Sequence, residues 1–340
     1  SGYEKKLETK ILESGFFDIT KVEQYLLQQN SMAVAPSGEP YTEIVRPSGF
    51  VNTDNITIGE LVGKKVILVN FMTYSSINCK RTIPYLNAWY GKYKNQGLEI
   101  VAIHTPEFAF EKNIDNVREA AKRLGIEYPV VLDNDYATWQ AYGNQYWPRK
   151  YLIDIHGNVV YDHIGEGAYE ETEMKIRELL EERARRIGEG SLDDEDLAAS
   201  QMPHAQNFAQ SPETYFGSLR NEDLANGTPG QAGQRLFVAP QTIARNALYL
   251  NGTWNIAPEY AESVSGASVV YEYVAKDVYI VAESDVPTEL EVWQDGVLQQ
   301  ILLVQGSTLY TLIQNETVGE HTIELRLHDG HIRLYAFTFG

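Results

Sequence analysis

A hydroxyl and a thiol lie three residues apart in the segment FMTYSSINCKRTIPYL, residues 71–86. Ser76 and Cys79 follow a continuous apolar run at residues 66–71, which is typical of a strand buried on both faces, and a helix is predicted to begin at the serine. A thiol in the first turn of a helix is activated, because unpaired amide groups and the helix dipole stabilise its thiolate. This is the spacing of a thiol-exchange centre, in which a first thiol attacks a disulfide and a second thiol, one turn further on, releases the product.

A second segment, QYWPRKYLID at residues 145–154, places Pro148 directly before another predicted strand. Cis peptide bonds are largely restricted to X-Pro, and a cis-proline leaves the neighbouring backbone free to hold an extended substrate segment. Trp147 precedes this proline and is a candidate for positioning that segment. The two motifs together predict a site that binds and exchanges disulfides.

Strands and helices alternate around these motifs. Apolar runs predict strands at residues 66–71, 98–105, 128–133 and 150–165, the last of which turns back as a hairpin at residues 156–158. Helices are predicted from the serine to about residue 94, over residues 114–124, and from residue 169 to about 186. This order favours an α/β sheet with parallel pairs and a terminal antiparallel hairpin.

The motifs resemble those of the thioredoxin-like thiol-disulfide oxidoreductases of the TlpA/ResA branch, and within it the extracytoplasmic part of DipZ-type cytochrome c biogenesis proteins. Those proteins carry YSCINC where this chain has YSSINC at residues 74–79. Further matches are RTIPYLNAWY after the motif, HTPEF at residues 104–108, SPETYFG at 211–217 and YAFTFG at 335–340. The resemblance spans about residues 40–340 and implies a thioredoxin-like domain followed by a second, all-β domain.

The resemblance also implies roles for individual residues. Ser76 occupies the position of the attacking cysteine, Cys79 that of the resolving cysteine and Pro148 that of the cis-proline. Trp147 flanks the proline loop. Met72 stands where the relatives have tryptophan, which is a second departure from the family pattern.

The serine decides the expected activity. Its hydroxyl is un-ionised near neutral pH and has no sulfur with which to form a mixed disulfide, so we expect Ser76 to leave the chain inactive in dithiol exchange. Two origins are compatible with the sequence: an engineered Cys→Ser change in a working enzyme, and a naturally degenerate, non-catalytic domain. A third interpretation, peroxide reduction by the lone thiol, needs an exposed thiol of low pKa, whereas Cys79 is predicted to lie inside the helix.

Acidic residues and histidines supply few further site candidates. Asn70 lies six residues before Ser76, where ordinary thioredoxins keep a buried acid, and Glu107 is a candidate replacement. The seven histidines have no partners at ligand spacing, and the acidic run at residues 191–200 lacks the alternation of a calcium loop, so no metal site is expected. No cofactor is expected either.

Composition restricts the partners and the compartment. With 28 Lys and Arg against 47 Asp and Glu, the net charge of -19 argues against nucleic acid as a partner. The single cysteine excludes an internal disulfide and a multi-cysteine zinc site. The first 30 residues carry too many charges for a signal peptide or a membrane span, and the Ser-Gly start without Met predicts a processed or excised fragment. The resemblance implies a location outside the cytoplasm, so we expect a soluble fragment of an exported or membrane-anchored protein.

Changes of pattern along the chain predict four parts. Residues 1–39 are a helical extension, residues 40–187 the thioredoxin-like domain and residues 188–212 a linker. Residues 213–340 contain short alternating runs divided by Gly, Asn and Asp, which favour a β-sandwich or jelly roll. The resemblance implies that this sandwich is of the carbohydrate-binding-module type. Trp254 and Trp293 are candidates for stacking on a sugar ring, although strand alternation predicts that many such aromatics belong to the core instead.

Two functions of different classes follow. The resemblance implies a cell-envelope oxidoreductase that acts on disulfide-bearing proteins, in cytochrome c maturation or oxidative folding, with electrons from a CcdA-like membrane partner. The alternative is a non-catalytic scaffold that combines a degenerate thioredoxin fold with a carbohydrate-binding sandwich.

Overall fold

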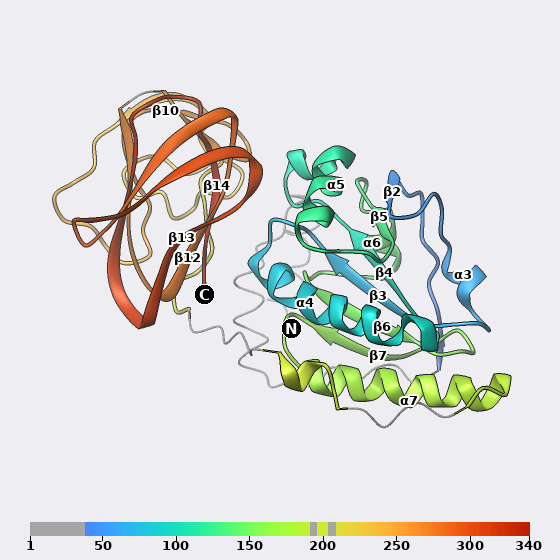
Figure 1. The fold of residues 1–340 in the computed structure, drawn as a ribbon. Coiled ribbons are helices and arrows are strands. Elements are labelled where there is room, and N and C mark those ends of the chain that lie inside the picture. The colour runs from blue at the N-terminus through green and yellow to red at the C-terminus, as the bar shows by residue number, and fades with distance from the viewer. Residues whose placement is uncertain (1–37, 191–195, 203–208, 265) are drawn as a thin grey trace, which may run out of the picture. The chain divides into compact units, whose positions relative to one another are not determined.

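The computed structural model describes residues 38–190, 196–202, 209–264 and 266–340 (Figure 1). The chain divides into two compact units, residues 1–204 and 205–340. The helical extension expected at residues 1–39 lies outside the described residues, except for its last two positions.

A seven-stranded sheet forms the centre of the first unit, in the order β1-β7-β6-β3-β4-β5-β2. In that order the strands are β1 (Glu39–Pro40), β7 (Asn158–Ile164), β6 (Arg149–Ile153), β3 (Val66–Met72), β4 (Leu98–His104), β5 (Val130–Leu132) and β2 (Gly49–Val51). β3, β4 and β5 are parallel, whereas the β6–β7 hairpin and the two outer strands pair antiparallel. All seven residues of β3 are buried, as the apolar run predicts for a central strand covered on both faces.

Helices cover both faces of this sheet (Figure 1). They are α3 (Ile58–Leu61), α4 (Ile77–Tyr93), α5 (Ile114–Arg123), α6 (Ala137–Ala141) and α7 (Tyr169–Ile187), with short 3-10 turns η1 (Lys94–Gln96), η2 (Ala109–Lys112) and η3 (Ala199–Gln201). α4 and α7 pack against each other, because the rings of Tyr85 and Tyr169 are stacked with centroids 3.5 Å apart. Phe71 of β3 instead contacts Trp139 of α6, so α6 lies on the other face.

A buried carboxylate fixes α4 against α7. Glu173 of α7 is fully buried and accepts four hydrogen bonds at 2.6 to 3.0 Å. The donors are the indole of Trp89, the phenol of Tyr93, and the backbone amides of Ala198 and Ala199. The helix that carries the site and the segment at residues 196–202 are thus held by one side chain.

The second unit is built from antiparallel strands. They are β8 (Thr214–Tyr215), β9 (Gly233–Phe237), β10 (Tyr249–Ile256), β11 (Ala261–Ser263), β12 (Ala267–Gln294), β13 (Val297–Leu327) and β14 (Arg333–Phe339). The pairings β12–β10, β10–β11, β11–β14 and β14–β12 close a circuit around an apolar core. The all-β class expected for this part of the chain agrees with these pairings.

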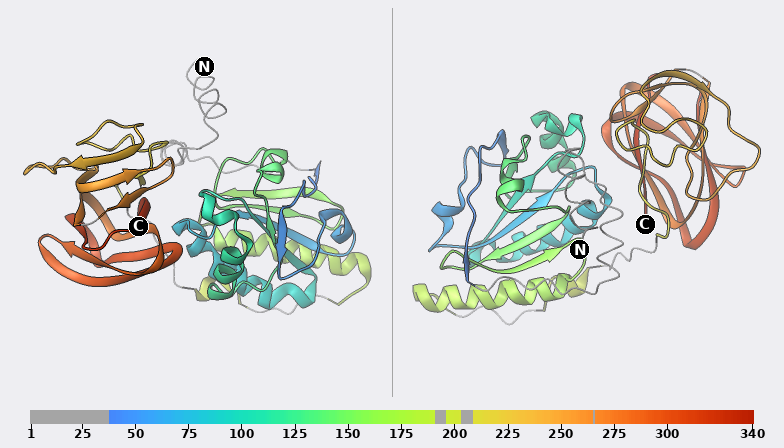
Figure 2. Two further views of the ribbon diagram at one scale, coloured as in Figure 1. Left: turned by 90° about the horizontal axis from the view of Figure 1, so that it is seen from above. Right: turned by 180° about the vertical axis from the view of Figure 1, so that it is seen from behind.

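β12 and β13 are longer than the sequence pattern predicts. The separate runs expected between residues 267 and 294 form one strand of 28 residues, and β13 has 31. Register breaks near Asp277, Ser284 and Glu291 bend both strands without ending their pairing, and the bends are visible in Figure 2. Turn-like residues in this unit therefore mark bulges as well as loops.

One predicted ligand contact is wrong. Trp254 is fully buried in the core of the second unit, and its indole N–H donates to the Asn251 carbonyl at 3.0 Å. Its place in β10 points the ring inward, so it offers no face to a sugar. The alternation of residues in the sequence predicts that one face of this strand points inward, but it does not say whether Trp254 lies on that face.

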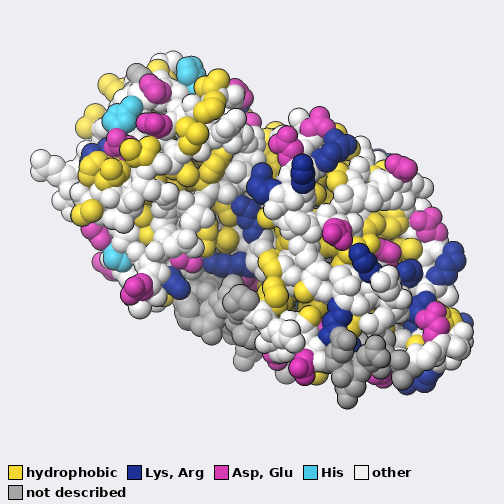
Figure 3. Space-filling model, viewed as in Figure 1, with side chains coloured by type: hydrophobic (Ala, Val, Ile, Leu, Met, Phe, Trp, Pro, Cys, Tyr) yellow, Lys and Arg dark blue, Asp and Glu magenta, His cyan; other side chains and the backbone are white. Residues whose placement is uncertain are grey.

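Charges of both signs are mixed on the surface of the first unit. Lys and Arg side chains are interspersed with Asp and Glu over the face drawn in Figure 3. In the ranges 38–190, 196–202, 209–264 and 266–340, no helix combines the length and the hydropathy needed to span a bilayer.

The Glu173 contacts lead to a first prediction. Replacing Glu173 by Gln puts an amide nitrogen where a carboxylate oxygen accepted hydrogen bonds, so some of the four buried donors lose their partner. This loss should lower the free energy of unfolding by about 2–4 kcal/mol. Urea denaturation measures the change. Glu170→Gln, on the exposed side of α7, is the matched control and should change the stability by less than about 0.5 kcal/mol. Equal stability of the two variants would contradict a central role for Glu173.

Candidate functional site

The candidate site lies where β3 ends and α4 begins. Ser76 is the N-cap of α4, with extended backbone, and its hydroxyl accepts a hydrogen bond from the Cys79 amide at 3.4 Å. Ser76 is half-buried, whereas only 1% of Cys79 is exposed. The two positions therefore differ in access: a group at position 76 can meet a partner from solvent, and Cys79 lies behind it.

Burial dominates the chemistry of Cys79. It raises the pKa of the free thiol to about 12, and the charges of Glu111 and Glu107 add to this effect. Hydrogen bonds from the Thr73 backbone and from Ser76 act in the opposite direction. The thiol is consequently neutral at physiological pH, which is the reverse of what peroxide reduction requires.

Glu111, which sequence reasoning missed, holds the turn between β3 and α4. Its fully buried carboxylate accepts bonds from the Thr73 hydroxyl and from the Ser75 hydroxyl and amide, the last two at 2.6 and 3.3 Å. It also accepts the backbone amides of Glu107 and Phe108 at 2.6 and 3.0 Å. Burial raises the pKa of Glu111, while these donors lower it. One carboxylate thus joins the site turn to the loop that follows β4.

Glu107 lies in that loop and is largely buried, with 7% exposed. Its charge contributes to the raised pKa of Cys79, but the hydrogen bonds from the turn between β3 and α4 are accepted by Glu111. Glu111 follows Glu107 by four positions and belongs to the 3-10 turn η2, and no sequence motif distinguishes the two acids. The two hydroxyls of Thr73 and Ser75, which need a buried partner, are the signal that could have indicated a nearby acid.

His104 packs beside the same turn. It ends β4 next to Met72 in the register of the two strands, and its ring stacks on Tyr74 with centroids 5.5 Å apart. Neither ring nitrogen has a hydrogen-bond partner among the described residues, and burial lowers the pKa of His104 to about 4. The residue therefore acts as a neutral aromatic ring at physiological pH.

The Trp147–Pro148 peptide bond is cis. Arg149 pairs with Phe71 in the antiparallel register of β6 and β3, so Pro148 lies at the end of β3 from which the Ser76 turn departs. Trp147 is 4% exposed and its ring packs 4.4 Å from that of Trp139. The tryptophan anchors the proline loop in the core.

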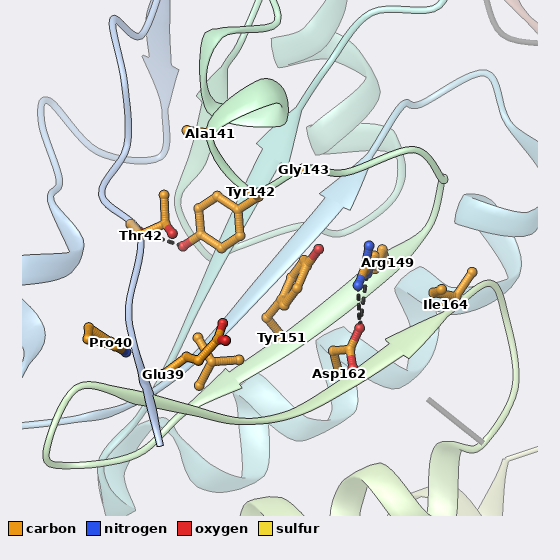
Figure 4. A pocket seen from close by; sticks show the side chains of 11 residues that line it. Glu39, Pro40, Thr42, Ala141, Tyr142, Gly143, Arg149, Tyr151, Asp162 and Ile164 are labelled. Carbon is orange, nitrogen blue, oxygen red and sulfur yellow. Dashed lines mark hydrogen bonds and ion pairs between the residues drawn. The ribbon is translucent and has the colours of Figure 1, made fainter. Parts of the chain in front are cut away.

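A cavity of about 480 Å³ lies beside β6, between β1, β7 and the end of α6 (Figure 4). Arg149 lines it and donates to Asp162 at 2.5 and 3.1 Å, and its guanidinium also lies 4.6 Å from the ring centroid of Tyr151. Because residues alternate along β6, Arg149 and Tyr151 point away from the face that carries Lys150. Within the described part of the chain, no group of three or more His, Cys, Asp or Glu is arranged to hold a metal ion.

Comparison with known proteins gives two family matches. The family model described as "Redoxin" matches residues 36–180, and the model described as "Thioredoxin like C-terminal domain" matches residues 211–340. The thiol-disulfide oxidoreductase ResA of Halalkalibacterium halodurans is 34% identical over 133 residues, which are 38% of this chain and 70% of ResA. The thiol-disulfide oxidoreductase YkuV of Bacillus subtilis is 28% identical over 144 residues, which are 42% of this chain and 96% of YkuV.

A longer match includes both units. Protein DipZ of Mycobacterium tuberculosis is 37% identical over 300 residues, which are 86% of this chain. The match covers 42% of DipZ, so the chain spans less than half the length of that relative.

The burial of Cys79 leads to a second prediction. Iodoacetamide should alkylate the folded chain at about pH 8 at least tenfold more slowly than the chain unfolded in guanidinium, because the buried thiol is almost entirely protonated. Mass spectrometry follows the reaction at the single cysteine. Equal rates in the folded and unfolded chains would show that Cys79 is accessible and contradict the geometry.

Proposed function

Because this chain belongs to the thioredoxin-like thiol-disulfide oxidoreductases, we propose that its parent activity is disulfide exchange with protein substrates at the N-terminus of α4. Position 76 would attack the substrate disulfide and Cys79 would resolve the mixed disulfide. Pro148, at the same end of β3, would hold the substrate backbone, with Trp147 fixing the loop.

One observation carries this proposal: a half-buried N-cap residue lies one turn before a buried thiol. The Ser76 oxygen already accepts the Cys79 amide, and a sulfur in its place would be stabilised as a thiolate by the same helix terminus. In the exchange, the thiolate at position 76 would bond to one substrate sulfur and release the other. Cys79 would then attack the sulfur at position 76 and release the reduced substrate.

The chain as written lacks that attacking sulfur. We therefore propose that it is inactive in dithiol exchange and that Ser76 stands in place of a cysteine of the parent enzyme. Among the described residues, the hydroxyl bonds to the amide and the thiol of Cys79 and to no general base, which is what an oxygen nucleophile would require.

The setting of the parent enzyme is also a proposal. By analogy with the DipZ and ResA relatives, we place it outside the cytoplasm, with disulfide-bearing proteins as substrates. A CcdA-like membrane protein would supply the electrons. Cytochrome c maturation and oxidative folding both fit this chemistry.

The second unit is proposed to be a jelly roll of the carbohydrate-binding type. Trp293 is the remaining aromatic candidate, and it is half-buried. The Arg326 guanidinium lies 4.0 Å from its ring centroid, and its indole N–H donates to Glu291 at 2.8 Å. A sugar would have to stack on the opposite face of the ring or displace Arg326.

Restoring the sulfur tests the activity. Ser76→Cys should reduce insulin disulfides in the presence of a small thiol, and the original chain should not, because only the variant has a dithiol. Insulin turbidity measures the reaction. The control, Ser76→Cys combined with Cys79→Ser, should form mixed disulfides but turn over at least about tenfold more slowly. An inactive Ser76→Cys protein that is folded would contradict the proposal and favour the scaffold function.

A glycan array tests the second unit. We expect binding that Trp293→Ala reduces at least about tenfold, since stacking on an aromatic face supplies much of the affinity for a sugar. The control is Tyr310→Phe, which keeps a half-buried aromatic ring on β13 and removes only a hydroxyl that donates to the Gln305 carbonyl, so it should leave glycan binding unchanged. The absence of any bound glycan, or binding that Trp293→Ala leaves unchanged, would contradict the carbohydrate-binding proposal.

A further inference from the structure

A lysine lies in the interior of the first unit, beneath the candidate site. Lys150 belongs to β6, two residues after Pro148, and it is fully buried. Arg149 and Tyr151, its neighbours in the strand, point into the cavity on the other face (Figure 4). Lys150 therefore points toward α4 and α7, the helices on the side of Cys79.

The contacts of Lys150 satisfy its amine only in part. Nζ donates to the Gly165 carbonyl at 3.3 Å and lies 5.4 Å from the ring centroid of Tyr169. An ammonium has three donors to satisfy, so a charged Lys150 would be costly in this place. Burial accordingly lowers the pKa of Lys150 to about 7. The amine can thus gain or lose a proton near physiological pH.

The cross-strand partner of Lys150 is Asn70 of β3. Asn70 is 1% exposed, and its Oδ1 has no hydrogen-bond partner among the described residues. An amide has no proton to exchange in this pH range. Of the two side chains in this cross-strand pair, only Lys150 can titrate.

Titratable groups face Lys150 from each element packed against it. Cys79 of α4 and Glu166 of the turn between β7 and α7 interact electrostatically with Lys150, and the ring of Tyr169 of α7 lies 5.4 Å from its Nζ. The charge of Glu166, and that of Cys79 when it is a thiolate, favour the protonated amine. His163 of β7 is kept neutral, because burial and the Lys150 charge lower its pKa to about 4.

Glu166 connects this interior to the surface. It pairs with Arg81 of α4 at 3.4 Å, and 18% of its side chain is exposed. Burial raises the pKa of Glu166, while Arg81 and Lys150 lower it. Lys150 is therefore coupled to a buried thiol, Cys79, and to a carboxyl group that is partly exposed to solvent, Glu166.

We propose that Lys150 controls the protonation of Cys79 during disulfide exchange, as the buried base that receives the thiol proton. This inference rests on the proposed function. The neutral amine takes the proton from sulfur as Cys79 attacks the mixed disulfide at position 76. A disulfide bond between residues 76 and 79 forms, the bond to the substrate sulfur breaks, and the departing thiolate regains a proton from solvent. Lys150 thus acts as the proton acceptor for Cys79.

The resolving step can be observed separately in the Ser76→Cys protein. The aromatic disulfide 5,5′-dithiobis(2-nitrobenzoate) should react with the thiol introduced at position 76 and release one coloured thiolate, and attack by Cys79 should then release a second. We expect the rate of the second release to rise with pH around 7 and then level off, since the amine must be neutral to take the proton. In Lys150→Met this inflection should be absent, and the rate near pH 7.5 at least tenfold lower.

Three further variants separate proton transfer from effects of charge and of folding. Lys150→Arg keeps the charge but cannot accept a proton, so it should not restore the inflection. Lys150→Gln provides a polar alternative if the methionine variant does not fold. The matched control is Lys80→Met. Burial lowers the pKa of Lys80 to about 8, but Cys79 is not among the groups that shift it. The second release in this variant should therefore keep its inflection near pH 7.

The outcomes separate the two proposals. Loss of the first release in folded Ser76→Cys would contradict the proposed function. A normal first release, with a second release of unchanged rate and pH dependence in Lys150→Met and Lys150→Gln, would overturn the role of Lys150 alone. A rate restored by Lys150→Arg would also overturn it, because charge and not proton transfer would then be the cause.

Discussion

The carboxylate of Glu111 is the interaction on which the candidate site depends. It collects two hydroxyls and three amides from the turn after β3 and from the loop after β4. Those groups are buried and would otherwise be unpaired, at a cost of about 1–3 kcal/mol each. By satisfying them, Glu111 allows a polar turn to sit at the end of a fully buried strand. The orientation of Ser76 and the first turn of α4 follow from that turn.

Exclusion of water from this part of the chain also determines the pKa values of the groups at the site. Burial raises the pKa of the Glu111 carboxyl group beside the turn and that of the Cys79 thiol inside the helix. The negative charges of Glu111 and Glu107 raise the pKa of the thiol further. A helix N-terminus by itself would lower that pKa. Burial prevails at Cys79, whereas position 76 is open enough for the helix terminus to matter more. The difference between an attacking and a resolving position is therefore a difference in access to water.

Some features of the structure could be predicted from local sequence patterns, and others could not. The apolar run of β3, the helix start at Ser76 and the proline before β6 all lie in short segments whose spacing can be recognised directly. The structure makes the Trp147–Pro148 bond cis and buries Trp147. In the second unit, turn-like residues at Asp277 and Ser284 predicted ends of strands, but the pairing continues through bulges.

The sequence by itself determined the class of chemistry, because a buried strand, a helix start and an Xaa-x-x-Cys spacing are local properties of the chain. Only the tertiary structure decided which distant side chains surround that centre. Glu111 reaches Ser75 across 36 residues, and Lys150 faces Asn70 across β6 and β3. Trp254 likewise turned out to belong to the core. Such contacts depend on strand register and on the face that each residue presents, and neither is encoded in the spacing of a single segment.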